Sequence, residues 1–489
     1  MLDYVLNITD EYLNSKTKTE RKKIGQFFTS KETAIFMANL SNYHKECVKI
    51  LDAGAGTGIL SIALLEKLNE VEEIKNIEID LYENDINTAE ILEKCMEMAK
   101  EKIKKIKKYN IIRENFIVYN KDEKEPKYDI VICNPPYKKI GKNDDEAVVM
   151  KEVIYGQPNM YFLFMAMSER LLKDDGEMIF IIPRSWTSGT YFKKFREVFL
   201  DNVKLTNIHL FVSRDKVFNK ENVLQETMIL RAVKTKVKQD KIQITQSFSN
   251  EDFDKINTYN IDYDLCIEKE NERYVYLPVD KTDIEVLETV NKFKTTLKDI
   301  GLKLKTGLTV DFRNEEFLEM ESNTNNVPLF SSSHFKNGLI CFPSGENEAQ
   351  YVNKINLSLL QKNTNYLFIK RFSSKEESRR IQPAMFFKNE FDSYDYISTE
   401  NHINFISSLN NEELNEEMIY GLYSLYNSTL YDKYYRILNG STQVNATEIN
   451  NIPIPSENII IQMGRKLQKE KNISTEICDN ILLEAIKNG

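Results

Sequence analysis

The sequence predicts an α/β protein: a doubly wound, mainly parallel sheet followed by a mixed α+β domain. Up to about residue 235, short apolar runs alternate with segments whose apolar residues recur at helical spacing. This alternation is typical of βαβ units. Beyond Val233 the chain becomes polar, and from roughly residue 300 it is irregular and rich in Asn, Ser, Tyr and Phe. We therefore expect a first domain at 1–240, a connection at 241–300 and a second domain at 301–489.

Seven apolar runs are expected to form the strands of the first domain. All are short and bounded by polar or glycine-rich segments, as buried strands are. They lie at 48–53, 79–82, 111–118, 128–133, 177–183, 205–211 and 226–232. Helices are expected at 31–40, 58–68, 86–108, 161–172 and 283–293, with a terminal helix pair at about 457–487. A parallel sheet of this kind binds its ligand at the carboxyl ends of the strands.

Composition limits the setting in which the protein works. The 489 residues are 41% hydrophobic and 29% charged, which suits a globular chain of about two or three domains. There is no apolar run of about 18 residues, so no membrane partner is expected. The first residues lack the basic and apolar segments that are typical of a signal peptide. Six cysteines without a C-x-x-C pair and four dispersed histidines predict neither a disulfide framework nor a metal site. We expect a cytoplasmic protein.

The net charge of −9 weakens a nucleic-acid hypothesis. Proteins that bind nucleic acid usually carry a basic footprint. The charge does not exclude such a partner, because only the docking face must be basic.

The segment Asn134-Pro135-Pro136-Tyr137 directly follows the apolar run 128–133, at the expected carboxyl end of a strand. Proline has a fixed φ and no backbone N–H, so the carbonyls of this segment can be held in one direction. Together with the side-chain oxygen of Asn134, they could accept the two hydrogens of a planar amino group. Tyr137 could stack on the ring that carries this group. A strand that ends in a proline turn is the simpler alternative.

A glycine-rich segment, 52–58, joins the first expected strand to its helix. Glycines let a ligand approach the backbone closely, and a helix N-terminus offers free N–H groups to an anionic group. The spacing differs from the G-x-G-x-x-G of nicotinamide sites, and Asp52 would repel a pyrophosphate. An aspartate suits the ammonium and sulfonium side of S-adenosylmethionine. We therefore predict Asp52, Ala53, Gly54 and Gly56 as cofactor contacts.

Three more segments are candidates for the same cofactor site. Glu83 ends the second expected strand, where an acidic residue can accept both ribose hydroxyls. Asn115 and Phe116 end the third, where they would bind the adenine edge and line its pocket. Thr29 and Ser30 precede a helix that they would cap, and they could also hold a carboxylate. Each has a simpler alternative. Glu83 could be a solvated carboxylate, Phe116 a core residue, and Thr29 and Ser30 an ordinary helix cap.

These motifs follow one order along the chain: Gly25 to Ser30, Asp52 to Gly56, Glu83, and Asn134 to Tyr137. In this order the sequence resembles the γ-class N6-adenine DNA methyltransferases of restriction–modification systems. In that family the cofactor half comes first and the target-recognition domain follows. The segments 365–377 and 439–449 are similar to the Pst/Bsu-type subgroup. The resemblance thus spans most of the chain.

The resemblance implies a seven-stranded class I methyltransferase sheet, S-adenosylmethionine as cofactor and a flipped adenine as substrate. Asn134 and Pro135 would accept the two N6 hydrogens, and Asn134 would also contact the cofactor. Tyr137 would act as a third catalytic residue by stacking on the extruded base, and Phe218 would close its other side. The family usually places Asp where Asn115 aligns. Asn can still accept through its side-chain oxygen, and the adjacent Glu114 is the alternative at this position.

Double-stranded DNA is the partner that the resemblance implies. A local basic cluster is the predicted DNA contact: Lys370, Arg371, Lys375, Arg379 and Arg380. A separately encoded cognate endonuclease is a possible second partner, and the protein is expected to be a monomer or a weak dimer.

Two other functions remain open on the sequence alone. RNA methyltransferases and protein-glutamine methyltransferases can share Asn-Pro-Pro-Tyr, but they are usually smaller. A catalytically silent DNA-binding subunit is the alternative of another class. The intact segment from Asn134 to Tyr137 argues against it. We find no convincing nuclease motif.

Overall fold

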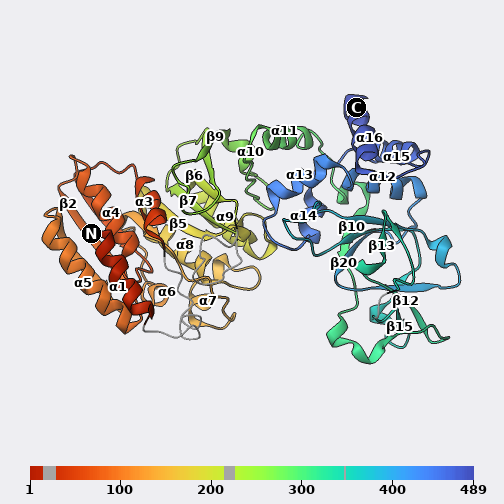
Figure 1. Ribbon diagram of the computed structural model, residues 1–489, viewed down its shortest axis with the longest axis horizontal. Helices are drawn as coiled ribbons and strands as arrows, with labels where there is room; N and C mark the ends of the chain where they lie inside the picture. Colours follow the sequence, from red (N-terminus) through yellow and green to blue (C-terminus); the bar gives the residue numbers. More distant parts are fainter. Residues whose placement is uncertain (15–28, 214–225, 346–347, 489) are drawn as a thin grey trace. The chain divides into compact units, whose positions relative to one another are not determined.

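The computed structural model describes residues 1–14, 29–213, 226–345 and 348–488. The chain divides into two compact units, Met1–Asp280 and Lys281–Gly489 (Figure 1). The first unit has one sheet and the second has two, and each unit has its own apolar core. The division falls inside the predicted connection 241–300.

The first unit is built on one mixed sheet. Among the described residues its strand order is β3-β2-β1-β4-β5-β7-β6-β8-β9. Neighbours from β3 to β5 are parallel, and β7 is antiparallel to β5 and β6. The order reverses between β1 and β4, which is where an open α/β sheet forms its ligand crevice. The strands are β1 (Cys47–Asp52), β2 (Asn76–Tyr82), β3 (Ile106–Ile112), β4 (Tyr128–Cys133), β5 (Leu172–Pro183), β6 (Lys204–Phe211), β7 (Thr227–Val233), β8 (Lys241–Ser247) and β9 (Asn257–Asp262).

The predicted fold class is confirmed, but the third strand differs from its expected range of 111–118. β3 ends at Ile112, and Phe116–Tyr119 forms a short helix, α6. The helix expected at 86–108 is also shorter, because α5 ends at Lys102. The lysines beyond it belong to the turn and to β3, the terminal strand of the sheet. An edge strand with exposed lysines resembles a solvated helix end in sequence.

Two strands extend the sheet beyond the seven expected ones. β8 pairs in parallel with β6, and β9 pairs antiparallel with β8. Both lie in the range that was predicted as a connection. In β8 the buried Ile242 and Ile244 alternate with more exposed polar residues. A strand near a sheet edge needs few apolar residues, which is why the polar composition concealed it.

Helices cover both faces of the sheet. One core cluster joins strand residues to α1 (Leu2–Asn14), α3 (Lys31–Asn39), α4 (Ile59–Glu70) and α5 (Ile86–Lys102). In β4, Ile130 and Ile132 belong to this cluster, whereas Val131 and Cys133 are equally buried outside it. Successive strand residues point to opposite faces, so β4 is covered on both sides. α8 (Met160–Leu171) and α9 (Lys193–Asn202) pack against β5 and β6.

The second unit contains two sheets and a group of helices. Among the described residues, one sheet has the order β10-β20-β17-β18-β14-β13 and the other β11-β15-β12-β19-β16. Its core is aromatic, with Phe330, Phe368, Phe386 and Phe405 buried together. The strands are β10 (Leu302–Thr306), β11 (Leu318–Glu319), β12 (Asn326–Phe330), β13 (Phe335–Lys336), β14 (Leu339–Ile340), β15 (Tyr351–Asn353), β16 (Gln361–Lys362), β17 (Tyr366–Lys370), β18 (Pro383–Phe386), β19 (Tyr396–Thr399) and β20 (Ile403–Ser408).

Helices α12 and α15 cross at very short range. A Cβ on Gly464 would lie 1.8 Å from the Glu417 carbonyl oxygen, and one on Gly421 would lie 2.0 Å from that of Ile460. The two glycines therefore let the backbones approach each other directly. The helices of this unit are α11 (Lys281–Val290), α12 (Glu416–Tyr426), α13 (Thr429–Leu438), α14 (Ala446–Asn451), α15 (Glu457–Leu467) and α16 (Thr475–Asn488). No helix of the described residues is long and apolar enough to cross a membrane.

We predict that Gly464→Ala destabilises the second unit, because its methyl group would overlap the Glu417 carbonyl and force the two helices apart. The expected loss is about 2 to 3 kcal/mol in the free energy of unfolding, measured by denaturant titration. Gln462→Ala, at an exposed position of the same helix, is the control and should change stability by less than about 0.5 kcal/mol. Equal stability of the two variants would contradict the close helix contact.

Candidate functional site

The segment Asn134 to Tyr137 follows β4 at the carboxyl end of the parallel strands. The Asn134 side chain donates from Nδ2 to Thr29 Oγ1 at 3.1 Å. The Tyr137 hydroxyl donates to the carbonyl of Ile181 at 2.9 Å. Both side chains are thus held by groups far away in the sequence. The backbone of the segment is constrained in addition by its two prolines.

A cavity of about 280 Å³ opens at the same edge of the sheet. It lies at the carboxyl ends of β1, β2 and β4, where the topology places a ligand crevice. Most of the predicted site residues line it: Thr29, Ala53, Gly54, Gly56, Glu83, Asn115, Phe116, Asn134 and Pro135. The structure therefore brings together residues from five separate sequence segments.

The glycine loop lines the cavity and precedes α4. Gly56 has a φ of +54° and Gly58 a φ of +93°, values that L side chains rarely adopt. A Cβ on Gly58 would also come within 2.7 Å of Leu92. Gly58 is the N-cap of α4, so the loop leads directly into a helix N-terminus.

Glu83 joins this loop to the end of β2. Its Oε2 accepts from the Gly56 backbone N–H at 3.1 Å, and its Oε1 accepts from the Asp85 N–H at 2.8 Å. Burial raises the pKa of the Glu83 carboxyl to about 7, although these N–H groups act in the opposite direction. Asp52 is completely buried, and burial raises its pKa to about 7 as well.

The raised pKa values define how the two carboxyls affect folding. A raised folded-state pKa means that the protonated form is favoured in the native protein. The stability that Glu83 and Asp52 contribute is therefore fully present below their ordinary pKa values of 4.5 and 3.8 and is lost as the pH rises through about 7. Near neutral pH, ionisation of the two carboxyls carries a free-energy cost that a cationic ligand can offset.

The adenine side of the predicted pocket is built around α6. Asn115 is the N-cap of this helix, and its Oδ1 accepts from the N–H groups of Ile117 and Val118. Its Nδ2 donates to Glu146 at 2.7 Å. Phe116 is buried, and its ring centroid lies 5.2 Å from that of Phe164. The Asn115 oxygen thus has a structural role in the cap besides its predicted one.

Several lining residues were not predicted from the sequence. They come from helices and loops that follow the sequence motifs: Lys138, Ile140, Glu146, Met160 and Phe164. Phe164 lies in α8, whose apolar pattern is that of any buried helix. Only the packing of α8 against the strands brings it to the cavity. Glu114, the alternative to Asn115 in the sequence alignment, lines the cavity together with Asn115.

Three described site residues do not line the cavity: Ser30, Asp52 and Tyr137. Ser30 caps α3 and accepts from Asn250. Asp52 is buried at the end of β1, where Ser61 donates to its Oδ2 at 2.6 Å. The Tyr137 ring packs edge-on against Tyr161. Phe218 lies outside the described residues.

The residues of the predicted basic cluster in the second unit have different partners in the structure. Lys370 pairs with Glu377 at 3.2 Å, and Arg371 donates to the Asn401 carbonyl at 2.8 Å. Arg379 lies half-buried, and its Nη2 donates to the carbonyls of Tyr426 and Ser428. Its guanidinium is therefore bonded to the protein itself.

The prediction that Arg380 contacts DNA is wrong for its side chain. Arg380 is only 1% exposed. Its Nε donates to Ser373, and its guanidinium lies over the ring of Tyr435. A charged group that is buried and hydrogen-bonded within the fold cannot reach a phosphate.

Comparison with known proteins places the chain in a family. Residues 15–218 match the model of the Eco57I restriction-modification methylases. The chain is 33% identical over 484 residues to the type II methyltransferase M.BsuBI of Bacillus subtilis, an alignment that covers 96% of this chain and 95% of that protein. It belongs to the type II restriction–modification methyltransferases. The type II methyltransferase M.PstI of Providencia stuartii is 30% identical over 482 residues, with 96% and 94% covered.

This membership confirms the predicted family and, with it, S-adenosylmethionine as the cofactor. Two solved structures resemble the whole fold. The DrdV–DNA complex has a TM-score of 0.51 at 14% identity and covers 95% of this chain and 59% of its own. A nuclease-deletion mutant of the Type ISP enzyme LlaGI with a DNA substrate mimic has a TM-score of 0.51 at 12% identity and covers 95% and 57%. At these identities the likeness concerns the fold alone.

We predict that Glu83→Gln weakens S-adenosylmethionine binding about tenfold or more, because a neutral amide replaces a charged acceptor. Since the pKa of Glu83 is about 7, the wild-type affinity should fall as the pH drops from 8 to 6, and the variant should show a smaller pH dependence. Isothermal titration calorimetry at several pH values measures both effects.

Glu78→Gln is the matched control for this experiment. Glu78 is exposed on the same strand, β2, away from its carboxyl end. Its replacement should leave the affinity and its pH dependence unchanged. A Glu83 variant that binds the cofactor as the wild type does would remove Glu83 from the cofactor site.

Proposed function

We propose that the protein is a site-specific methyltransferase that methylates N6 of an adenine flipped out of duplex DNA. One observation carries the proposal: Asn134 and Pro135 line the same cavity as the glycine loop and Glu83. The residues that would accept the hydrogens of an amino group and those that would bind the methyl donor therefore line one cavity. The alignment with type II methyltransferases along nearly the entire chain supports this function.

The cavity fits S-adenosylmethionine in its chemistry. Gly54 and Gly56 leave the backbone open to a ligand, and Glu83 offers a carboxylate to ribose hydroxyls. Phe116 forms a buried apolar wall suited to an adenine ring. When bound, the cofactor supplies an electrophilic methyl group, so that no covalent bond between protein and substrate is required.

The amide of Asn134 and the carbonyl of Pro135 activate the target amine in this proposal. The N6 lone pair of adenine is delocalised into its ring and is a poor nucleophile. Two acceptors that hold the N6 hydrogens favour a more tetrahedral nitrogen and localise the pair. The bond from Asn134 Nδ2 to Thr29 fixes the orientation of the amide and hence the direction of Oδ1. Thr29 therefore serves as a positioning residue for Asn134.

Tyr137 provides the stacking face for the extruded base. Its hydroxyl is fastened to the Ile181 carbonyl at 2.9 Å, which restricts the rotation of the side chain. Phe218, outside the described residues, would close the other side of the base. Stacking and edge contacts offset the few kcal/mol that extrusion costs. In-line transfer then depends on the positioning of the two reacting atoms.

Contacts to duplex DNA are assigned to the second unit. Lys370, Arg371 and Lys375 remain the proposed phosphate contacts, whereas Arg379 and Arg380 serve the fold. A monomer can methylate one strand at a time. A separately encoded endonuclease that cleaves the unmodified sequence is the proposed cellular partner.

A protein glutamine is the second candidate substrate, because a glutamine amide offers the same planar NH2 group. A release factor glutamine methyltransferase of Fusobacterium nucleatum is 28% identical over 145 residues, which is 27% of this chain. That similarity leaves the second unit without a role. The match of unit 2 to type II methyltransferases therefore favours DNA.

We predict that Asn134→Ala reduces methyl transfer by at least about a hundredfold, because one of two acceptors for the amine is lost. Cofactor affinity should change only a few-fold, since the glycine loop and Glu83 are intact. Steady-state transfer from labelled S-adenosylmethionine and calorimetric binding separate the two effects. Asn69→Ala, an exposed position in α4, should behave as the wild type.

The reaction itself is tested by exposing varied, unmethylated DNA to the purified protein and sequencing the modified adenines. N6-methyladenine within a defined sequence is the expected product and also gives the recognition site. Methylation of a protein glutamine with no modified adenine would favour the second candidate. Absence of transfer to any DNA at saturating cofactor would refute the proposed function.

A further inference from the structure

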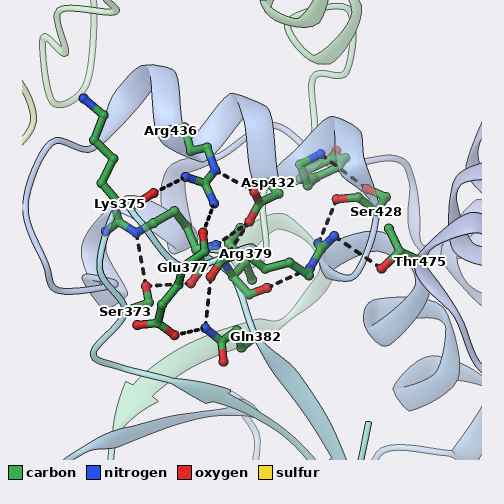
Figure 2. A network of polar contacts seen from close by, with 12 residues as sticks. Ser373, Lys375, Glu377, Arg379, Gln382, Ser428, Asp432, Arg436 and Thr475 are labelled. Carbon is green, nitrogen blue, oxygen red and sulfur yellow. Dashed lines mark hydrogen bonds and ion pairs between the residues drawn. The ribbon is translucent and has the colours of Figure 1, made fainter. Parts of the chain in front are cut away.

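The segment 371–382, which leads from β17 to β18, is hydrogen-bonded to α13. Arg436 of that helix donates from Nη1 to the Lys375 carbonyl and from Nη2 to the Glu377 carbonyl, both at 2.8 Å (Figure 2). The planar guanidinium thus spans two carbonyls of the segment. Arginine is suited to this role because its five donors have a fixed geometry.

Asp432, one helical turn before Arg436, holds the far end of the same segment. Its Oδ1 accepts from the backbone N–H groups of Arg380 at 2.6 Å and Ile381 at 3.1 Å. Its Oδ2 accepts from Arg436 Nε at 2.8 Å (Figure 2). The two side chains form an ion pair on α13, and together they bind the middle of the segment and its C-terminal end.

Two arginines of the segment itself add further hydrogen bonds. Arg379 donates to the carbonyls of Tyr426 and Ser428, at the junction of α12 and α13, at 3.1 and 3.0 Å. Arg380 Nε donates to Ser373 Oγ at 3.1 Å, which closes the segment on itself. The cationic side chains between β17 and β18 thus serve to fix the backbone as well as to carry charge.

The first residues of the segment meet the loop that follows α13. The Ser373 N–H donates to the Thr442 carbonyl at 3.0 Å, and the Val444 N–H donates to the Arg371 carbonyl at 2.7 Å. The segments 365–377 and 439–449, far apart in the sequence, are therefore neighbours in space. Their junction is a small backbone-paired surface rather than two independent loops.

This junction presents an aromatic ring and cationic groups. Phe372 is 36% exposed. The Arg371 guanidinium lies 5.4 Å from the centre of its ring, and the His402 ring packs edge-on against it at 5.2 Å. The Lys375 side chain points away from the Arg436–Asp432 ion pair (Figure 2). Aromatic faces beside fixed cations suit the bases, sugars and phosphates of a nucleic acid.

We propose that Arg436 and Asp432 are positioning residues that hold segment 371–382 in the shape that contacts DNA. This inference rests on the proposed function. Phe372, Arg371 and Lys375 are the contacting side chains, and the two residues of α13 act through them. A loop that is already ordered avoids the conformational entropy that a mobile loop loses on binding. A fixed loop also discriminates better between cognate and altered sites, because it adapts less to a wrong base pair.

Two variants disrupt the hydrogen bonds between α13 and the segment with little change in side-chain size. Asp432→Asn keeps a side-chain oxygen for the N–H groups of Arg380 and Ile381, but turns an NH2 group toward Arg436 Nε. Arg436→Lys keeps the charge, but one ammonium cannot span both carbonyls and Asp432. Arg465→Lys is the matched control, because Arg465 lies in α15, is largely exposed and forms only a long ion pair of 3.9 Å with Glu417 among the described contacts.

The test combines kinetics on DNA with backbone hydrogen exchange on the full protein. Asp432→Asn and Arg436→Lys should raise KM for cognate DNA about tenfold and reduce discrimination against a site with one altered base pair by a similar factor. The turnover number at saturating DNA and the S-adenosylmethionine affinity should stay within about twofold. Amides of 371–382 should exchange faster, whereas those of β1 to β5 should be unchanged. Arg465→Lys should match the wild type in every measurement.

The outcomes separate this inference from the proposed function. If the wild type methylates DNA and the two variants keep its KM and discrimination although 371–382 exchanges faster, the positioning role is refuted. A uniform fall in turnover, cofactor affinity and melting temperature would likewise refute it in favour of a general structural role. If the wild type transfers no methyl group to DNA, the proposed function fails, and exchange still reports whether Arg436 and Asp432 fix the segment. Should Asp432→Asn fail to fold, Arg436→Lys decides.

Discussion

The register of β1 between its two parallel neighbours is the constraint on which the candidate site depends. Asp52, the last residue of β1, lies opposite Leu81 of β2 on one side and Ile132 of β4 on the other. Continuing two residues along each strand leads to Gly54, Glu83 and Asn134, all of which line one cavity. Three motifs that are separated by dozens of residues thus become adjacent through backbone pairing alone. A shift of one strand by one residue would turn its side chains to the other face of the sheet.

Much of this arrangement could be predicted from the sequence, because the central strands are short, apolar and buried on both faces. β4 matches its predicted range, and Gly54, Glu83 and Asn134, which follow β1, β2 and β4, line one cavity. The edges of the sheet were less predictable. β3 carries lysines and β8 alternates with polar residues, since a strand with one solvated face needs few apolar side chains. Periodicity alone does not distinguish such strands from helix ends or linkers.

The second unit shows a different limit of sequence reasoning. Arg379 and Arg380 have the composition of a DNA contact, yet their guanidinium groups bond to carbonyls and a hydroxyl of the protein. Whether an arginine faces solvent or the interior depends on tertiary acceptors that no local pattern reveals. Glycines 421 and 464 are a similar case, because their role becomes visible only when α12 and α15 are brought together. Local sequence identifies strands and motifs well, whereas long-range packing determines whether an isolated polar group is buried or exposed.

The two buried carboxyls beside the glycine loop have a consequence for proton balance. With pKa values of about 7 for Asp52 and Glu83, a substantial fraction of these groups holds a proton at neutral pH. A cationic ligand favours their ionised forms and releases that proton to the solvent. Ligand capture and proton release are then two aspects of one equilibrium. The apparent heat of binding should therefore depend on the ionisation enthalpy of the buffer.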